Sequence, residues 1–428
     1  MKKNRITLLS IAVGFALTLT ACSAGSPAPD SAKTPSEETR TPISDRVSDG
    51  ALKLGYVLPE TGSLSGLGTG IIAGVNLAVD DIAAYEGENK PVVELVGGDE
   101  AGDPTIAGQT VDRLLSQDVD AIIGPVSSAI SLSVIDKITG SGVMQCAGAN
   151  TSATFSTYDS NGLYFRSIAP NIKQGPVLAD AVIGEGASRV AIMVRNDDYG
   201  ESLRSSLVEN LEAEGAEIVA LETFDPAATT FSAEVATVKN ASPDAVVVIA
   251  FQEGASIIRS LIETGLGPDD IKLFGTDGMS LGALAVTVNE AAPDALEGMQ
   301  ATQSSSQNDP GFIQRLLDAN PGLAVTNFAP YHYDCVISIA LASMYADSDA
   351  TPDIAEAMYT ITNGPGTACT SFAECADLIE AGEEIDYEGV SGPMDLNAAG
   401  EPSVGLFDVV RFDSAGVPQI ASTVRSED

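Results

Sequence analysis

Short polar turns that follow apolar runs are the parts of this chain best suited to bind a small molecule. Hydroxyl-bearing and small residues dominate the first three of six such turns, and Tyr199, Phe251 and Asp277 occur in the last three. The turns are 61–65, 124–128, 147–152, 196–200, 251–254 and 275–278. Hydroxyl and N–H donors suit a carboxylate, an acid suits an ammonium, and aromatic rings suit an apolar remainder. Any one turn could simply cap a helix, but the recurrence in six favours a site for a small zwitterion.

Catalytic and metal-binding motifs have much weaker support. Residues 278–282 fit the G-x-S-x-G pattern of a serine hydrolase, with Ser280 as the nucleophile. Such an enzyme needs a general base, and His332 is the only histidine of the chain. A single histidine also excludes His-rich metal sites, and neither a G-x-G-x-x-G nor a Walker A sequence is present. We therefore expect a protein that is not an enzyme and that uses neither a cofactor nor a metal.

A repeated strand–turn–helix pattern must position the polar turns. Each short β-rich run is followed by a turn with glycine or small polar residues and then by a stretch of helical periodicity. The runs are 52–58, 91–96, 120–124, 142–146, 189–194, 217–221, 245–250 and 272–274. This alternation predicts an α/β fold with parallel sheets covered by helices on both faces. Eight units exceed one comfortable sheet, so we expect two lobes, with ligands bound beyond the carboxyl ends of the strands.

The charge of the chain excludes one large class of partners. Its 428 residues carry 60 Asp and Glu against 21 Lys and Arg, a formal net charge of −39. Such a negative field repels phosphate backbones and anionic lipid headgroups. We therefore expect no nucleic-acid partner.

The N-terminus has the pattern of an export signal. Residues 1–5 are basic, 6–20 are apolar, and Leu19-Thr20-Ala21-Cys22 is similar to the lipobox of bacterial lipoproteins. This predicts a signal peptide over 1–21 and an acyl anchor on Cys22, which would hold the protein on the extracytoplasmic face of the cell membrane. An ordinary signal peptide with a chance cysteine is the alternative. Residues 22–50 are rich in Ser, Pro, Ala, Thr and charges, which predicts a flexible tether.

Four further cysteines are expected in an oxidising compartment. Cys369 and Cys375 are separated by five residues and form the natural local pair. By elimination, Cys146 would then pair with Cys335. Two buried free thiols are almost as good an interpretation of that second pair.

The body from about Ala51 to the C-terminus resembles one known family, the bacterial leucine/isoleucine/valine-binding proteins. These are the type I solute receptors of branched-chain amino-acid ABC transporters. The motifs are individually modest but occur in the order typical of the family: 58–62, 124–128, 149–152, 165–166, 198–200, 275–278, 333–334 and 389–393. The resemblance implies two Rossmann-like lobes joined by a three-crossover hinge that closes on the ligand. The first lobe would comprise 51–169 plus 304–391, and the second 170–303 plus 392–428.

The resemblance also implies ligand-binding roles for seven residues. They are Leu67, Ser128, Ala149, Thr151, Tyr199, Phe251 and Asp277. Ser128 would bind the ligand carboxylate with help from Thr151, and the carbonyl of Ala149 and the acid of Asp277 would bind its ammonium. Tyr199 and Phe251 would be the aromatic residues of the second lobe, and Leu67 would be a pocket wall. Asp277 is one methylene shorter than the Glu often found there, and Phe251 has no hydroxyl, so the side-chain preference of the pocket is left open.

Three functions follow from these patterns. The first is a lipid-anchored substrate-binding protein that traps a small amino acid, branched-chain or related, and delivers it to an ABC permease. The second is a ligand-sensing receptor module for an amino-acid-like, amide-like or urea-like molecule. The third, a lipid-anchored hydrolase, depends only on the pentapeptide around Ser280.

Overall fold

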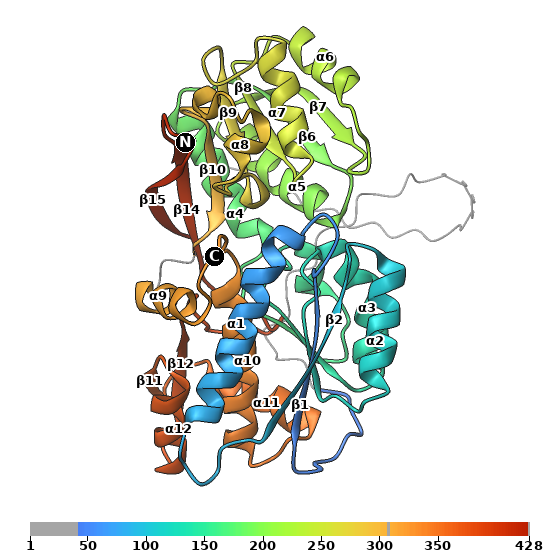
Figure 1. Ribbon diagram of the computed structural model, residues 1–428, viewed down its shortest axis with the longest axis vertical. Coiled ribbons are helices and arrows are strands. Elements are labelled where there is room, and N and C mark those ends of the chain that lie inside the picture. Colours follow the sequence, from blue (N-terminus) through green and yellow to red (C-terminus); the bar gives the residue numbers. More distant parts are fainter. Residues whose placement is uncertain (1–41, 306–308, 427–428) are drawn as a thin grey trace, which may run out of the picture. The chain divides into compact units, whose positions relative to one another are not determined.

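Two separate sheets organise the described part of the chain, residues 42–305 and 309–426 of the computed structural model (Figure 1). The first sheet has five strands in the order β2-β1-β3-β4-β5, all parallel. The second has seven strands in the order β15-β14-β10-β9-β8-β6-β7. We call the two halves built on these sheets the first and the second lobe. The predicted α/β class with two Rossmann-like lobes is confirmed.

Eight strands of the two lobes agree with the eight predicted apolar runs, whereas the strands over 164–166, 300–304, 405–412 and 418–426 were not predicted. In the first lobe they are β1 (Leu52–Leu58), β2 (Val93–Asp99), β3 (Ala121–Ile123), β4 (Met144–Ala147) and β5 (Tyr164–Arg166). In the second lobe they are β6 (Arg189–Arg195), β7 (Glu217–Phe224), β8 (Ala245–Ile249), β9 (Lys272–Gly275), β10 (Gln300–Ser304), β14 (Gly405–Phe412) and β15 (Pro418–Ser426). All five residues of β8 are buried, as expected for a central parallel strand covered on both faces.

Helices cover both faces of each sheet. The first lobe has α1 (Ser65–Ala84), α2 (Pro104–Leu115), α3 (Ser128–Gly140), α9 (Pro310–Ala319), α10 (Ala329–Ala346), α11 (Thr351–Ile361), α12 (Phe372–Glu380) and the 3₁₀ turn η1 (Ala153–Thr157). The second lobe has α4 (Asn171–Gly184), α5 (Asp198–Ala213), α6 (Ser232–Asn240), α7 (Gly254–Glu263), α8 (Leu284–Val288) and the 3₁₀ turns η2 (Asp277–Met279) and η3 (Pro293–Leu296).

The long helices α1 and α10 form the centre of the first lobe's core. Every residue of α10 from Ala329 to Met344 is buried, and α1 packs along it. Among the described residues, α1 is the one helix long and apolar enough to cross a membrane by length and composition. Because half of its residues are buried against this core, we interpret it as the central helix of a folded lobe.

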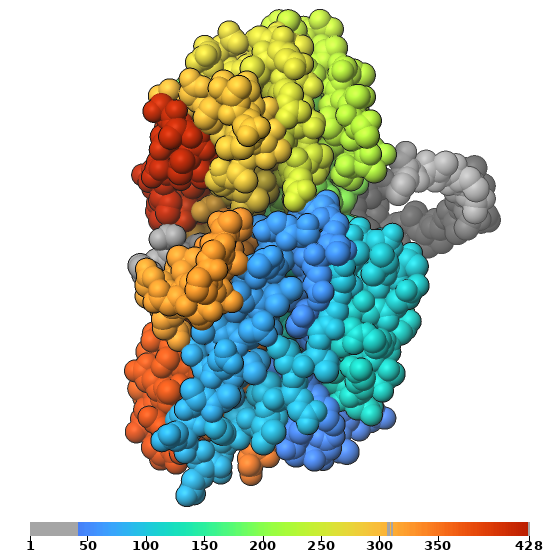
Figure 2. Space-filling view, viewed as in Figure 1, coloured from blue at the N-terminus to red at the C-terminus, as the bar shows by residue number. Residues whose placement is uncertain are grey.

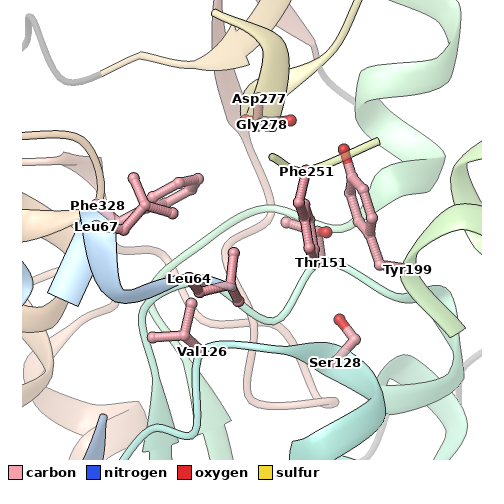
Figure 3. A pocket seen from close by; sticks show the side chains of 11 residues that line it. Leu64, Leu67, Val126, Ser128, Thr151, Tyr199, Phe251, Asp277, Gly278 and Phe328 are labelled. Atoms are coloured by element: carbon pink, nitrogen blue, oxygen red, sulfur yellow. The ribbon is translucent and has the colours of Figure 1, made fainter. Parts of the chain in front are cut away.

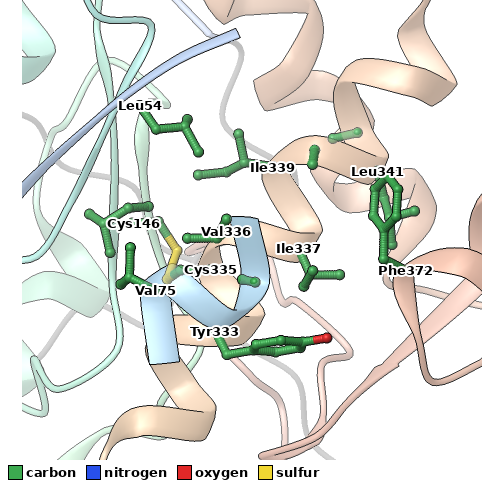
Figure 4. Close-up of a cluster of buried hydrophobic side chains, with 14 of the residues drawn as sticks. Leu54, Val75, Cys146, Tyr333, Cys335, Val336, Ile337, Ile339, Leu341 and Phe372 are labelled. Atoms are coloured by element: carbon green, nitrogen blue, oxygen red, sulfur yellow. A yellow bond between two sulfur atoms is a disulfide. The ribbon is translucent and has the colours of Figure 1, made fainter. Parts of the chain in front are cut away.

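Both predicted disulfides are present. Cys146 of β4 is joined to Cys335 of α10, with 5.8 Å between the Cα atoms. Figure 4 shows this bond inside the apolar cluster, beside Val75 and Val336. Cys369 is joined to Cys375. The alternative of two buried free thiols at Cys146 and Cys335 is therefore wrong, and the long bond ties the sheet to the helix that covers it.

The chain passes between the lobes three times. It leaves the first lobe after β5, returns after β10, and leaves again between β13 (Gly392–Pro393) and β14. On the face shown in Figure 2, residues of the two lobes meet across the middle of the molecule. The buried carboxylate of Asp334 on α10 fixes the turn just before β13, from which the last passage starts, since it accepts hydrogen bonds from the backbone N–H groups of Val390 and Ser391. These connections are the three crossovers that the resemblance implies.

The structure adds three features to the predicted arrangement. Strands β14 and β15 are antiparallel to their neighbours, so the second sheet is mixed at one edge. A small third sheet joins β11 (Thr367–Cys369), β12 (Ile385–Gly389) and β13. Consequently 392–393 pair with the first lobe, and Met394 and Leu396 join its core, ahead of the second-lobe strand β14. The exact lobe limits stay a prediction.

The N-terminal predictions lie mostly outside the described residues. This applies to the signal peptide 1–21, to Cys22, and to the tether up to residue 41. The last part of that tether, 42–50, contacts the first lobe: Ile43 N donates to Asn161 O at 2.8 Å, and the Ser44 hydroxyl donates to Gly142 O at 2.9 Å. The folded body therefore begins before Ala51.

Candidate functional site

A pocket between the two lobes contains all seven residues that the sequence singled out. The space between its walls that no protein atom occupies is about 410 Å³, including the part open to solvent. Its lining residues are Leu64, Leu67, Val126, Ser128, Ala149, Thr151, Tyr199, Phe251, Asp277, Gly278 and Phe328 (Figure 3). The first lobe contributes the turns after β1, β3 and β4, and the second lobe contributes those after β6, β8 and β9. This is the strand edge at which open parallel sheets bind ligands.

Hydrogen-bond donors gather at the first-lobe end of the pocket. Ser128 is the first residue of α3, so its side chain lies beside N–H groups that have no partner within the helix. The hydroxyl of Thr151 is buried and has no hydrogen-bond partner among the described residues. The Ser128 hydroxyl accepts a hydrogen bond from Ser152 N at 3.3 Å and still has its own proton to donate. A helix N-terminus with hydroxyls that can donate favours a negatively charged group. This end of the pocket can therefore accept a carboxylate.

Two buried side chains hold these donors in place. Asn150 donates to the carbonyls of Pro125 and Val126 at 2.8 and 3.0 Å, which ties the turn after β4 to the turn before α3. Arg166 donates through Nη1 to the carbonyls of Asn150 and Ser152, both at 2.8 Å, on either side of Thr151. The guanidinium is paired in turn with Glu401, whose Oε2 lies 2.9 Å from Arg166 Nε. The polar end of the pocket is thus rigid before any ligand arrives.

Asp277 is the acid of the pocket, and it lies on the second lobe. It is buried, and burial raises the pKa of its carboxyl, although bonded donors act in the opposite direction. Oδ1 accepts a hydrogen bond from Ser304 N at 2.8 Å, and Oδ2 accepts one from Gln174 Nε2 at 2.6 Å. Each carboxylate oxygen has a second acceptor position, so the acid can still bind a cationic group from the pocket. It also links η2 to α4 and to the end of β10, close to the crossovers.

Aromatic rings form the second-lobe wall. Tyr199 and Phe251 stack with ring centroids 5.1 Å apart, and the Tyr199 hydroxyl donates to Thr276 Oγ1 at 2.9 Å. The guanidinium carbon of Arg195 lies 3.5 Å from the centroid of Phe251. Arg195 is itself paired with Asp197 and Glu253, so its charge is compensated. The phenyl ring is fixed by its neighbours and presents a rigid apolar surface to the pocket.

Phe328 lines the pocket but was not singled out from the sequence. It precedes α10 with φ 65°, a left-handed conformation that is rare for a bulky residue. His332 Nδ1 lies 2.8 Å from the carbonyl oxygen of Phe328 and supports this conformation. Non-glycine residues in such strained conformations cluster at binding sites. The residues Leu64, Val126 and Gly278 were likewise not assigned to the site, although all three lie in turns that the sequence marked.

The structure does not support the hydrolase hypothesis. The hydroxyl of Ser280 donates to the carbonyl of Asp277 at 2.8 Å and so closes the η2 turn. His332 lies on α10 of the first lobe, where it is buried, and burial lowers its pKa to about 4. In the described residues nothing aligns the two as nucleophile and base. The G-x-S-x-G match is therefore a coincidence of sequence.

Comparison with known proteins agrees with this fold. The family described as periplasmic binding protein matches residues 51–415, and the chain belongs to this family. These are solute-binding proteins, not enzymes. Within this family the chain is of the leucine/isoleucine/valine-binding type, which confirms the resemblance found in the sequence.

Three similar proteins illustrate the range of the family. The chain is 26% identical over 358 residues to a Leu/Ile/Val-binding protein homolog 2 of Brucella abortus, covering 83% of this chain and 89% of that protein. It is 25% identical over 378 residues to a chemotactic signal transduction system substrate-binding protein, BasB, of Halobacterium salinarum, covering 85% of this chain and 87% of that protein. A solute-binding protein of an ABC transporter from R. palustris, solved in complex with benzoate, has a TM-score of 0.71 at 19% identity, covering 89% of this chain and 98% of that chain.

Proposed function

We propose that this protein is the extracytoplasmic substrate-binding component of an ABC importer, and that its cargo is a small α-amino acid, branched-chain or related. The observation that carries the proposal is the distribution of groups in the pocket. Carboxylate-binding donors lie on the first lobe, an acid lies on the second, and apolar side chains lie between them. A zwitterion with an apolar side chain satisfies both ends only when the two lobes hold it together.

The proposed binding mode assigns one role to each wall. The α-carboxylate lies at the N-terminus of α3, against Ser128 and Thr151. The ammonium lies between the carbonyl of Ala149 and the carboxylate of Asp277. The side chain of the ligand packs against Leu67, Phe251 and the other apolar residues of the pocket, where burial contributes about 25 cal/mol per Å² of apolar surface.

An aromatic carboxylate is the second candidate cargo. It is favoured by the two internal hydrogen bonds of Asp277, which satisfy both carboxylate oxygens without a ligand ammonium. The aromatic walls formed by Phe251, Tyr199 and Phe328 also suit a planar ring. The similar fold of the benzoate-bound protein from R. palustris is consistent with such a cargo.

An alternative to import is a role in sensing. The two roles differ in the membrane protein that binds the liganded form of this protein. The similarity to the chemotactic substrate-binding protein of Halobacterium salinarum supports a sensing module, in which a signal transducer replaces the permease. The pocket would serve both roles equally. Pull-down of detergent-solubilised membranes with the liganded protein distinguishes them, because permease subunits support import and a membrane transducer supports sensing.

Replacement of Ser128 tests the carboxylate end. Ser128→Ala removes one hydrogen bond to a charged group, which contributes roughly 1.5–3 kcal/mol. We expect calorimetric titration to show an affinity about ten- to a hundredfold weaker for L-leucine and for benzoate alike. Ser133→Ala, on an exposed part of the same helix, is the matched control and should bind like the wild type. Equal affinities of the Ser128 variant and the control would contradict the proposed orientation.

We further propose that the mature protein is held on the membrane by acyl chains on Cys22, as the N-terminal pattern predicts. A single basic run, a short apolar run and Leu19-Thr20-Ala21-Cys22 support it. Cys22→Ser should leave the protein unprocessed or release it from the membrane fraction, whereas Ser23→Ala should not. Unchanged processing and membrane retention of the Cys22 variant, seen by fractionation and intact mass, would show that the anchor is not there.

A further inference from the structure

Glu100 is a buried carboxyl next to the pocket for which the proposed binding mode has no use. It follows β2 directly and is 0% exposed. Its Oε2 accepts a hydrogen bond from Val126 N at 2.8 Å, and its Oε1 has no hydrogen-bond partner among the described residues. Charged carboxyls are almost never buried without a cation or a full set of donors.

Glu100 is bonded to the turn that forms the carboxylate end of the pocket. Its acceptor bond fixes the backbone of the turn 124–128, of which Val126 and Ser128 line the pocket. Its own backbone is held at the end of the first strand, since Glu100 N donates to Leu58 O at 3.1 Å. Glu100 thus connects the ends of β1 and β2 to the turn that opens α3.

The charged groups around Glu100 are mostly acids; the exception is Arg113 of α2, whose Nη2 donates to the carbonyl of Gly97 on β2 at 2.7 Å. Asp99 adjoins it on β2 and raises its pKa, Glu60 lies on the turn after β1, and Asp103 caps α2. The first titratable residue of α3 is Asp136, far from the N-terminus of that helix. Burial is the main cause that raises the pKa of Glu100 to about 8, and the backbone N–H groups of Val126 and Ser127, which favour the charged form, only partly offset it.

We infer that Glu100 is an uncharged positioning residue for the carboxylate end of the pocket, and that an anionic ligand binds there only while Glu100 keeps its proton. The inference rests on the proposed function in one respect, namely that the ligand carries a carboxylate. If Glu100 ionised, its negative charge would lie on one side of the turn 124–128 and the carboxylate of the ligand on the other. The two charges would repel each other in a site from which water is largely excluded.

A ligand-free measurement tests the protonation state. Between about pH 4.5 and pH 8 the folded protein keeps this proton and the unfolded chain has lost it, so stability falls as the pH rises. Glu100→Gln has the shape of the protonated acid and no proton to lose. The ratio of the unfolding constants of wild type and variant should therefore rise by up to tenfold per pH unit across this window. Other buried acids contribute equally to both proteins and cancel.

The matched control is Asp103→Asn, the loss of an exposed acid on the neighbouring turn. Hydrogen bonds from backbone N–H groups lower the pKa of Asp103, so this carboxyl is ionised in the folded and the unfolded chain above pH 5. The effect of Asp103→Asn on stability should therefore be constant above pH 5. A flat ratio for Glu100→Gln between pH 5 and pH 8, like that of the control, would overturn the inference.

Titration with benzoate and with L-leucine tests the coupling to binding. The wild-type affinity for whichever probe binds should fall by up to tenfold per pH unit above about pH 8, and binding near that pH should take up protons from the buffer. Glu100→Gln should bind with an affinity that is constant between pH 7 and pH 9. Equal pH slopes in both proteins would overturn the coupling. Binding of neither probe would count against the proposed function instead, and the stability comparison would still decide the charge of Glu100.

Discussion

Asp277→Asn is expected to reduce the affinity for L-leucine by roughly a hundred- to several thousandfold. In the proposed complex the ligand ammonium lies against the Asp277 carboxylate, in a pocket that closes around both. Removing one partner of a buried ion pair costs roughly 3–5 kcal/mol, because the other charge stays buried without compensation. Calorimetric titration of wild type and variant measures this loss directly.

Asparagine is the informative substitution, because Asp277 also has a structural role. From the sequence alone a carboxylate in a turn would be expected to contribute little to folding. The structure shows instead that Ser304 N and Gln174 Nε2 both donate to it. Asp277→Ala would therefore leave the buried Ser304 N without this acceptor, and would leave Gln174 Nε2 only its longer bonds to Thr302. In Asp277→Asn the amide oxygen still accepts from Ser304. Rotation of the Gln174 amide then turns its unpaired Oε1 towards the new NH₂ group.

Benzoate provides the control for this substitution, since it has no ammonium to lose a partner. Its affinity for Asp277→Asn should stay within about threefold of the wild type, or roughly 0.7 kcal/mol. A similarly small change for L-leucine would contradict the assignment of Asp277 to an ammonium. That result, with tight benzoate binding retained, would establish the aromatic carboxylate as the cargo.

Removal of the Cys146–Cys335 disulfide is expected to have the largest effect on stability. The bond closes a loop of 189 residues, and the chain-entropy model predicts a loss of about 5 kcal/mol when such a loop is opened. Cys146→Ala/Cys335→Ala is the suitable variant, because alanine keeps both positions apolar within the buried cluster. Guanidinium unfolding, followed by circular dichroism, gives the change in the free energy of unfolding.

The second disulfide of the same chain is the matched control. Cys369 and Cys375 are only 6 residues apart, and opening this loop should cost about 2 kcal/mol by the same model. The long-range variant should therefore be less stable than the Cys369→Ala/Cys375→Ala variant by about 3 kcal/mol. If the two double variants unfold at the same denaturant concentration with equal slopes, the long bond does not constrain the unfolded chain as proposed.

The strands and the general architecture were predictable because they depend on local pattern. Runs such as 245–249 are short and apolar throughout, as expected for a strand that is buried on both faces. The antiparallel edge of the second sheet was not predictable in this way. Strand β15 is largely exposed and mixed in composition, and its direction depends on pairing with β14, which no local pattern encodes.

The site was predictable where residues follow strands, and less so where they depend on tertiary packing. Ser128, Thr151 and Asp277 stand directly after strands, so the topology of a parallel sheet brings them together. Phe328 precedes a helix instead, and it reaches the pocket only through its left-handed backbone and the packing of α10. The partners Gln174 and Glu100 are polar residues whose burial no sequence pattern indicates.

The most direct test of the account is calorimetric titration of the purified mature protein, freed of bound ligand by partial unfolding and refolding. L-leucine, L-isoleucine, L-valine and benzoate would be the probes, and Asp277→Asn the companion protein. We expect saturable binding of at least one of the amino acids at one site per chain, and loss of this binding in the companion protein. Absence of binding for every amino acid, in a protein whose unfolding is cooperative and whose disulfides are intact, would contradict it.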